Sequence, residues 1–216
     1  MRAGRNRPDI TLVAVTKTRT PNEIDEAITA GVAQIGENRV QEAATKKPQV
    51  TRKATWHLVG NLQTNKAKKA LELFDFIQSV DSLHLAFELQ RRCEQLGKCV
   101  TALIEVNTSG ELSKHGVQPD AVSDLVAQVL KLDRLQLVGL MTIGPGLAIE
   151  DPEASRPCFC ILRELAEDCR QRFSISLPHL SMGMSSDFEV GIEEGATIIR
   201  VGTAIFGQRP APVKPE

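Results

Sequence analysis

Two residues of this 216-residue chain stand out for the chemistry that they could perform. Lys17 follows the β-branched, apolar run Ile10–Thr16, and an amine held at the end of a buried strand can lose its charge and attack an aldehyde. The same position also suits a lysine whose stem packs while its ammonium reaches water. Arg200 interrupts the apolar run Thr197–Val201, where a guanidinium needs hydrogen-bond acceptors. A carboxylate such as Glu37, or a ligand, could supply them.

Small turn residues follow the last two apolar runs. Gly202 and Thr203 offer close backbone approach, N–H groups and a hydroxyl, and Ser181-Met182-Gly183 is a similar turn. Phosphate groups bind at such turns in α/β barrels, although a glycine after a strand is more often only a turn residue. Nearby, the spacing of Ser186 and Glu189 predicts a capping box that begins a helix.

The histidines and cysteines show no metal-ligand spacing. The four histidines form no H-x-x-x-H pair and have no cysteine close by, so the sequence predicts no metal site. Only His57, beside Trp56 in an apolar run, is a candidate site residue. The five cysteines are odd in number and contain no C-x-x-C, which is typical of reduced thiols in a cytoplasmic protein.

Charge and composition argue against several classes of partner. Lys and Arg number 26 against 27 Asp and Glu, so no net positive field would hold a nucleic acid. No segment has the pattern of a secretory signal, and none approaches the roughly 18 apolar residues of a membrane span. The sequence has no tyrosine, so no phenol is available as acid, base or phosphate ligand. We therefore expect a cytoplasmic protein without a nucleic-acid or membrane partner.

Short apolar runs alternate with helix-capable segments along the whole chain. The eight strand candidates are Ile10–Thr16, Ala33–Gly36, Trp56–Gly60, Phe76–Val80, Val100–Val106, Leu135–Ile143, His179–Met182 and Thr197–Val201. The first helix is predicted to begin with the capping box of Thr20 and Glu23 and to end at Gly31. The other helix candidates are Arg39–Lys47, Asn65–Leu73, Ser82–Leu96, Pro119–Lys131, Glu153–Arg172 and Phe188–Glu194.

Strict alternation of strands and helices requires parallel strands. Eight such units can close into a (β/α)8 TIM barrel, and a doubly wound open sheet is the alternative, because periodicity does not distinguish closure from an open edge. No linker or repeat marks a second domain. We expect one domain over residues 1–216 with a short proline-rich tail at 208–216.

In a βα barrel the functional residues lie at the carboxyl ends of the strands. The positions that directly follow the apolar runs are Lys17, Glu37, Asn38, Asn61, Asn107, Met141–Gly144, Ser181–Gly183, Gly202 and Thr203. The barrel hypothesis therefore predicts that Lys17 shares one end of the molecule with the glycine turns.

Several co-linear motifs carry a resemblance to a known family. They are Val13–Lys17, Gly36–Glu42, Trp56–Lys66, Ser113–Gly116, Gly139–Ile143, Leu180–Ser185 and Ile199–Gly207. With these motifs the sequence resembles the pyridoxal phosphate homeostasis proteins, single-domain relatives of the amino-terminal barrel of alanine racemase. The resemblance implies a (β/α)8 barrel of the fold-type III class that binds pyridoxal 5′-phosphate (PLP).

The resemblance also implies roles for individual residues. Lys17 would hold PLP as a Schiff base, and Arg200 would face the pyridine nitrogen. Ser181, Gly202 and Thr203 would hold the phosphate. Asn38, Met182 and Ser185 would be neighbours of the ring or phosphate, and His57 would line the pocket.

The expected function is a binding protein in PLP, vitamin B6 and amino-acid homeostasis, without catalytic turnover. An arginine opposite the pyridine nitrogen keeps that nitrogen unprotonated and weakens the electron sink that PLP enzymes use. In alanine racemase a tyrosine from a second domain opposes the lysine, and this sequence offers neither after Gly207.

Two alternatives remain open at this stage. One is an amino-acid racemase-like PLP enzyme that uses Lys17 and either His57 or a residue of a partner. The other is a regulatory scaffold that binds no PLP. For the leading hypothesis we expect a monomer, with apo-PLP enzymes as possible recipients of the cofactor.

Overall fold

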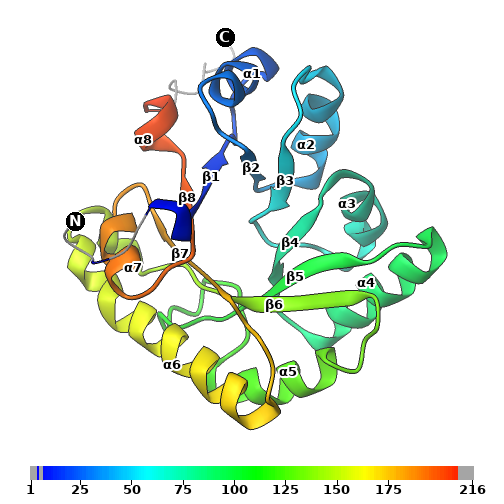
Figure 1. Ribbon diagram of the computed structural model, residues 1–216, viewed down its shortest axis with the longest axis vertical. Helices are drawn as coiled ribbons and strands as arrows, with labels where there is room; N and C mark the ends of the chain where they lie inside the picture. Colours follow the sequence, from blue (N-terminus) through cyan, green and yellow to red (C-terminus); the bar gives the residue numbers. More distant parts are fainter. Residues whose placement is uncertain (1–3, 5–6, 209–216) are drawn as a thin grey trace.

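Eight parallel strands form a closed barrel in the computed structural model, which describes Gly4 and residues 7–208 (Figure 1). Each strand pairs with the next, and β8 pairs with β1. The strands are β1 (Thr11–Val15), β2 (Gln34–Glu37), β3 (Thr55–Leu58), β4 (Phe76–Val80), β5 (Val100–Glu105), β6 (Leu135–Met141), β7 (His179–Met184) and β8 (Ile198–Val201). The predicted (β/α)8 barrel is confirmed, and the open-sheet alternative is wrong.

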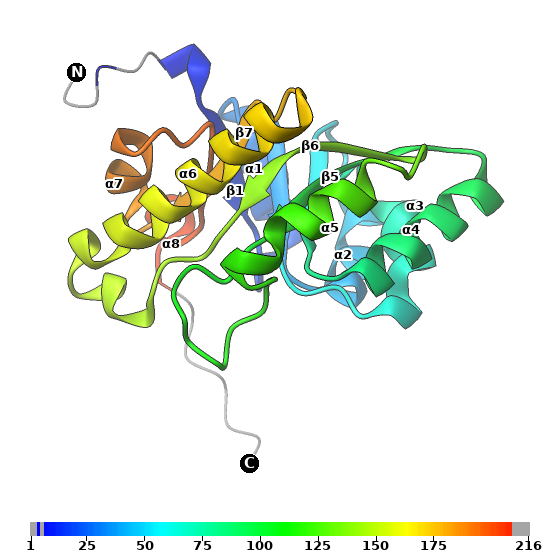
Figure 2. The same cartoon turned by 90° about the horizontal axis from the view of Figure 1, so that it is seen from below.

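Helices surround the barrel and connect successive strands (Figures 1 and 2). They are α1 (Pro21–Thr29), α2 (Val40–Lys46), α3 (Ala67–Leu73), α4 (Leu83–Leu96), α5 (Val122–Val129), α6 (Arg156–Phe173), α7 (Phe188–Glu193) and the short α8 (Thr203–Phe206). Single 3₁₀ turns are η1 (Arg7–Asp9), η2 (Lys47–Gln49), η3 (Thr64–Lys66), η4 (Pro119–Ala121), η5 (Gly146–Ile149) and η6 (Pro152–Ser155). The predicted tail at 208–216 lies outside the described residues except for Gln208.

Local sequence signals explain where several helices begin and end. The predicted capping box of α1 is present, because the Thr20 side chain accepts from the Glu23 amide and the Glu23 carboxylate accepts from the Thr20 amide. The predicted box of Ser186 and Glu189 is wrong. Helix α7 begins at Phe188 with Asp187 as its N-cap residue, and that residue makes no side-chain capping bond.

The Asp187 carboxylate is engaged elsewhere, which explains why it does not cap α7. It accepts hydrogen bonds from the Met184 amide at 2.7 Å and from the Ser155 hydroxyl at 2.5 Å. Asp187 is 1% exposed, so these two bonds satisfy a buried carboxylate. They also fix the loop that follows β7 against η6.

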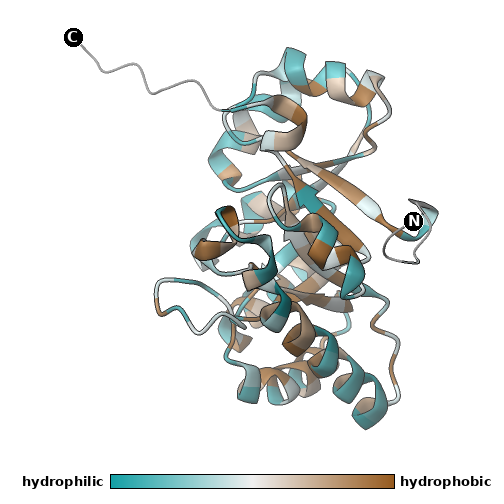
Figure 3. Ribbon diagram, turned by 90° about the vertical axis from the view of Figure 1, so that its left-hand side faces the viewer, coloured by the Kyte–Doolittle hydropathy of each residue, from teal (hydrophilic) through white to brown (hydrophobic). Residues whose placement is uncertain are grey.

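The core has two layers, as expected for a barrel whose strands are buried on both faces. Side chains inside the barrel form a small cluster of Val13, Val59, Phe76, Leu103, Met141 and Ile198. A larger cluster, which includes Trp56, Phe159 and Met182, packs between strands and helices. Figure 3 shows the apolar strands inside and hydrophilic residues on the outer helices.

No helix in the described part of the chain combines the length and the apolar character that crossing a bilayer demands.

Candidate ligand-binding site

A cavity of about 550 Å³ lies at the carboxyl ends of the strands. Six of the nine predicted site residues line it: Lys17, Asn38, Ser185, Arg200, Gly202 and Thr203. The wall also includes apolar side chains, among them Val15, Val59 and Ile143. The barrel therefore brings an amine, a guanidinium and a small-residue turn around one space.

Lys17 lies in the turn that follows β1, and its side chain is half-buried. Val13 belongs to the cluster inside the barrel, so Val15, two residues later on β1, points the same way. Lys17, in the turn that follows, lines the same cavity as Val15. The turn continues through Thr18, whose φ of +66° is unusual for a residue other than glycine.

Arg200 lies at the buried floor of the cavity, 4% exposed. It donates from one terminal nitrogen to the Ser181 hydroxyl at 2.5 Å and from the other to the Thr142 carbonyl at 2.7 Å. Burial lowers its pKa to about 10, against the attraction of Glu105 and Asp187, so the guanidinium stays protonated at neutral pH. These two bonds use part of its five N–H donors.

The suggested pairing of Arg200 with Glu37 is wrong. Glu37 is fully buried, and its Oε1 accepts hydrogen bonds from the Thr16 hydroxyl at 2.6 Å and from Lys46 at 3.0 Å. A local cation on α2 therefore balances the charge of this carboxylate. The acceptors of Arg200 are neutral groups on β7 and after β6.

A chain of hydrogen bonds runs from Arg200 across the barrel interior. The Ser181 hydroxyl donates to Gln78 Oε1 at 2.6 Å, and Gln78 Nε2 donates to His57 Nδ1 at 2.9 Å. His57 Nε2 then donates to Gln34 Oε1 at 2.8 Å. With one ring nitrogen donating and the other accepting, His57 is neutral, and burial lowers its pKa to about 4.

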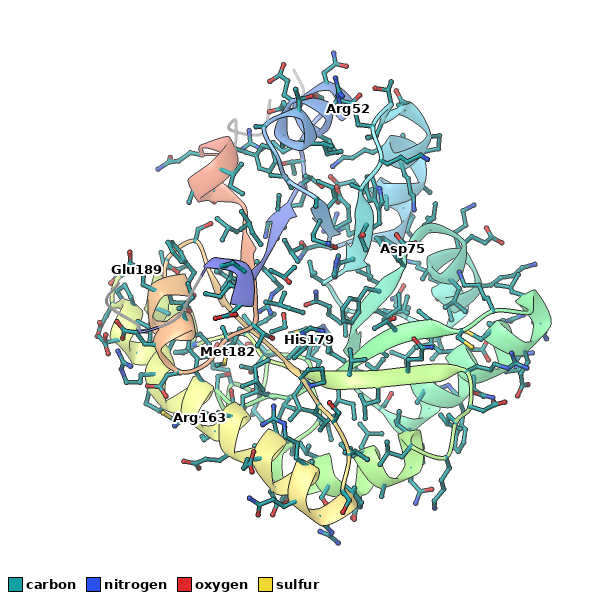
Figure 4. The ribbon with its side chains drawn as sticks, viewed as in Figure 1. Arg52, Asp75, Arg163, His179, Met182 and Glu189 are labelled. Atoms are coloured by element: carbon teal, nitrogen blue, oxygen red, sulfur yellow. The ribbon has the colours of Figure 1, made fainter. Side chains whose placement is uncertain are left out.

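Three predicted site residues are not among those that line this cavity. Ser181 is fully buried, and its hydroxyl bonds Arg200 and Gln78 beneath the cavity floor. His57 lies deeper in the interior, against Phe76. Met182 points to the other side of β7 and packs in the outer core, as Figure 4 shows with Met182 on the α7 side and His179 nearer the barrel centre.

Ser185 and the turn after β8 form the polar side of the cavity. The Ser185 hydroxyl accepts hydrogen bonds from the Gly202 amide at 3.1 Å and the Ala204 amide at 3.3 Å. Two backbone N–H groups therefore converge on one oxygen, which is the arrangement that anion oxygens use. A Cβ at position 202 would lie 3.2 Å from the Val15 carbonyl, so glycine allows the turn to approach β1 closely.

Glu105 is a candidate functional residue that the sequence analysis missed. It lines a second cavity of about 260 Å³, which shares Asn38, Val59 and Ile143 with the first. Glu105 is 5% exposed and its Oε2 has no hydrogen-bond partner within the described residues. Burial, and secondarily Asp81, raise its pKa to about 7, while Arg200 opposes the shift.

Comparison with known proteins places this arrangement in a family. The family model for the alanine racemase N-terminal domain matches residues 2–210. The pyridoxal phosphate homeostasis protein of Aquifex aeolicus is 44% identical over 209 residues, covering 96% of this chain and 91% of the relative. The chain belongs to the pyridoxal phosphate homeostasis protein family.

Solved structures of a related protein match the fold of this chain over almost its whole length. PipY of Synechococcus elongatus PCC7942 has been solved without PLP and with PLP bound. The two structures match with TM-scores of 0.87 and 0.86, at 40% sequence identity, and cover 95% of this chain and 96% of PipY. This chain and PipY therefore share the same barrel over almost their whole lengths.

Proposed function

We propose that this chain binds PLP in the larger cavity and holds it as a reserve for PLP and amino-acid homeostasis. The observation that carries the proposal is the placement of Lys17, Arg200 and the Ser185–Gly202 contact around one space. The names of the relatives and the PLP-bound structure of PipY support the choice of cofactor.

The residues around the cavity match the groups of PLP. When bound, the cofactor supplies an aldehyde carbon, with which an uncharged lysine amine condenses to a C=N bond with release of one water. We assign Lys17 to that carbon and Arg200 to the pyridine nitrogen. Ser185, Gly202 and Thr203 are assigned to the phosphate, because the Gly202 and Ala204 amides already converge on a single oxygen.

The proposed role is holding without catalytic turnover. Arg200 can only donate to the pyridine nitrogen, so that nitrogen would be unprotonated and the ring a poor acceptor of electrons. A racemase would also need a second acid–base group opposite Lys17. His57, the candidate for that role, lies outside the cavity with both ring nitrogens engaged. We therefore expect no sustained exchange of amino-acid α-protons with D2O.

The cavity runs from a buried floor to an exposed rim, which suits release of the ligand. Arg200 is buried, whereas Thr203 at the phosphate side is exposed and Ile149 is 80% exposed. We propose apo-PLP enzymes as recipients and a monomer as the working form. The five cysteines are free, which supports a function in the reducing cytoplasm.

Substitution of Lys17 tests the proposal. We expect purified wild-type protein to take up PLP with visible absorbance, and borohydride to fix the cofactor covalently to the peptide that contains Lys17. Lys17→Ala removes both signals and leaves the circular dichroism spectrum unchanged, because the amine of a half-buried turn residue contributes little to the core. Lys68→Ala, an exposed lysine of α3, is the matched control. An unchanged absorbance spectrum in Lys17→Ala would refute the proposal.

A further inference from the structure

A buried group of charges, which we call the β2–α2 clamp, lies directly beside the turn that carries Lys17. It consists of Glu37 at the end of β2 and of Glu42 and Lys46 on α2. Lys46 is 8% exposed, an unusual burial for a lysine. Its Nζ bonds Glu37 Oε1 at 3.0 Å and Glu42 Oε1 at 2.5 Å, so each carboxylate holds the same ammonium.

The clamp contacts both chain neighbours of Lys17. On one side, Lys46 Nζ donates to the Thr16 carbonyl at 2.7 Å, and the Thr16 hydroxyl donates to Glu37 Oε1 at 2.6 Å. On the other side, the Thr18 amide donates to Glu42 Oε1 at 2.5 Å. The backbone that enters Lys17 and the backbone that leaves it are therefore both fixed by one set of side chains.

The conformation of Thr18 shows that this turn needs support. Its φ of +66° lies in the left-handed region, which a β-branched residue rarely adopts. Such a conformation persists only where the surroundings hold it. The Glu42 carboxylate provides that support as an anion, because the hydrogen bonds from Lys46 and the Thr18 amide outweigh burial and lower its pKa.

From this geometry we infer that Glu42 and Lys46 are positioning residues, which hold the backbone on each side of Lys17 so that its amine points into the cavity. The inference rests on the proposed function, since it concerns the reaction of Lys17 with the aldehyde of PLP. A purely structural clamp would stabilise the pairing of β1 with β2, and its loss would not slow this reaction more than it weakens binding of the rest of the cofactor.

The test separates the reaction of Lys17 from binding of the rest of the cofactor. The covalent step is followed by the change in absorbance when PLP forms the C=N bond with Lys17, which gives a rate constant. Borohydride trapping confirms the attachment. Non-covalent binding is followed with pyridoxine 5′-phosphate, which keeps the ring and phosphate but has no aldehyde. Glu42→Ala removes the acceptor of the Thr18 amide, whereas Glu42→Gln keeps an acceptor at that position.

We expect Glu42→Ala to lower the rate constant at least tenfold while the dissociation constant for pyridoxine 5′-phosphate changes less than twofold. Glu42→Gln should recover the rate to within about threefold of wild type. The matched control is Glu72→Ala, which removes an exposed glutamate of α3 whose partner is Lys69. Lys46→Met removes the bond to the Thr16 carbonyl and is measured in the same way, so a folding defect of either variant leaves the other as a test.

Two outcomes would overturn the inference. One is an unchanged rate constant in folded Glu42→Ala or Lys46→Met. The other is an equal loss of rate and of pyridoxine 5′-phosphate affinity, which would indicate a general structural role. Failure of wild-type protein to attach PLP at Lys17 is a different result, because it refutes the proposed function before the clamp is tested.

Discussion

At the scale of single residues, Arg200 shows how a buried cation can be kept available for a ligand. Its two acceptors, the Ser181 hydroxyl and the Thr142 carbonyl, are neutral and satisfy donors without cancelling the charge. Gln78 Oε1 accepts a hydrogen bond from the Ser181 hydroxyl, and the hydroxyl oxygen in turn accepts one from Arg200. The interior hydrogen-bond chain therefore fixes the direction of the guanidinium and leaves its charge in place.

Glu105 makes the stability of the protein depend on pH. Burial is the main reason that its pKa rises from 4.5 to about 7. A carboxyl with a raised folded-state pKa costs stability above its unfolded pKa, so the penalty grows between pH 4.5 and 7 and is then constant. We expect Glu105→Gln to raise the free energy of unfolding by up to about 3 kcal/mol at pH 8 and by only a few tenths at about pH 4.5.

Urea unfolding of wild type and Glu105→Gln at the two pH values checks this prediction. Groups other than Glu105 titrate in both proteins, so the difference between them isolates the Glu105 carboxyl. Glu72→Gln, at an exposed position of α3, should show no such pH-dependent difference. The same stability difference at both pH values would contradict the raised pKa of Glu105.

The sequence pattern predicted Lys17 and Arg200 as site residues but missed Glu105, although all three are charges in, or directly after, an apolar run. Lys17 and Arg200 were found because each is a charge at the end of, or inside, an apolar run. Glu105 is also a charge in such a run, but the prediction ended this strand one residue later and examined Asn107 instead. Its direction follows from Leu103, which lies two residues earlier and points into the barrel.

At the scale of elements, the end of β7 explains which of the two predicted serines, Ser181 and Ser185, lines the cavity. The predicted strand ended at Met182, whereas β7 continues to Met184, and its register against β8 shifts between Ser181 and Met184. The end of the strand therefore lies two residues later, and Ser185 instead of Ser181 reaches the cavity. All eight strands were predicted within two residues at each end, but a register shift leaves no signal in hydrophobic periodicity.

The pairing of β6 with β7 depends on a glycine. Gly139 is paired with His179, and a Cβ at this position would lie 1.9 Å from the His179 carbonyl oxygen. That oxygen belongs to the backbone of a neighbouring strand and cannot move alone. We expect Gly139→Ala to lower the free energy of unfolding by about 3 kcal/mol, at the upper end of the usual overpacking cost.

Equilibrium urea unfolding measures this effect against a glycine in open space. A Cβ added to Gly146, at the start of η5, would meet no atom within 4 Å, so Gly146→Ala should change stability by less than about 0.5 kcal/mol. Equal stability of Gly139→Ala and Gly146→Ala would show that β6 and β7 can separate without cost, contrary to a closed, tightly paired barrel.

At the scale of the whole molecule, closure of the barrel creates the site. Lys17 follows the first strand, and Arg200 lies on the last, so in an open sheet these residues could lie on opposite edges. Pairing of β1 with β8 places Val13 opposite Arg200 and brings Gly202 against the Val15 carbonyl. The candidate site therefore depends on the fold class, because the amine, the guanidinium and the glycine turn come together only when β8 pairs with β1.

The same architecture predicts how the cofactor leaves. In the proposed binding mode the phosphate would face the exposed Thr203 and the ring would face the buried Arg200, so release would need only motion outward through the rim. We expect transfer of PLP to an apo-PLP enzyme to be limited by this release. The rate constant for activation of the acceptor enzyme should then be independent of acceptor concentration. It should equal the rate constant at which the holo-protein loses its PLP absorbance in an excess of a small-molecule aldehyde scavenger.

Transfer kinetics over a wide range of acceptor concentrations distinguish release from handover. Passive release gives one limiting rate constant, shared by different apo-enzymes, because the slow step occurs in this protein alone. A rate that keeps rising with acceptor concentration and exceeds the scavenger rate would mean that the acceptor docks at the rim and draws PLP out. In that case the exposed rim would be a protein interface, and the passive reserve proposed for this barrel would be replaced by directed delivery.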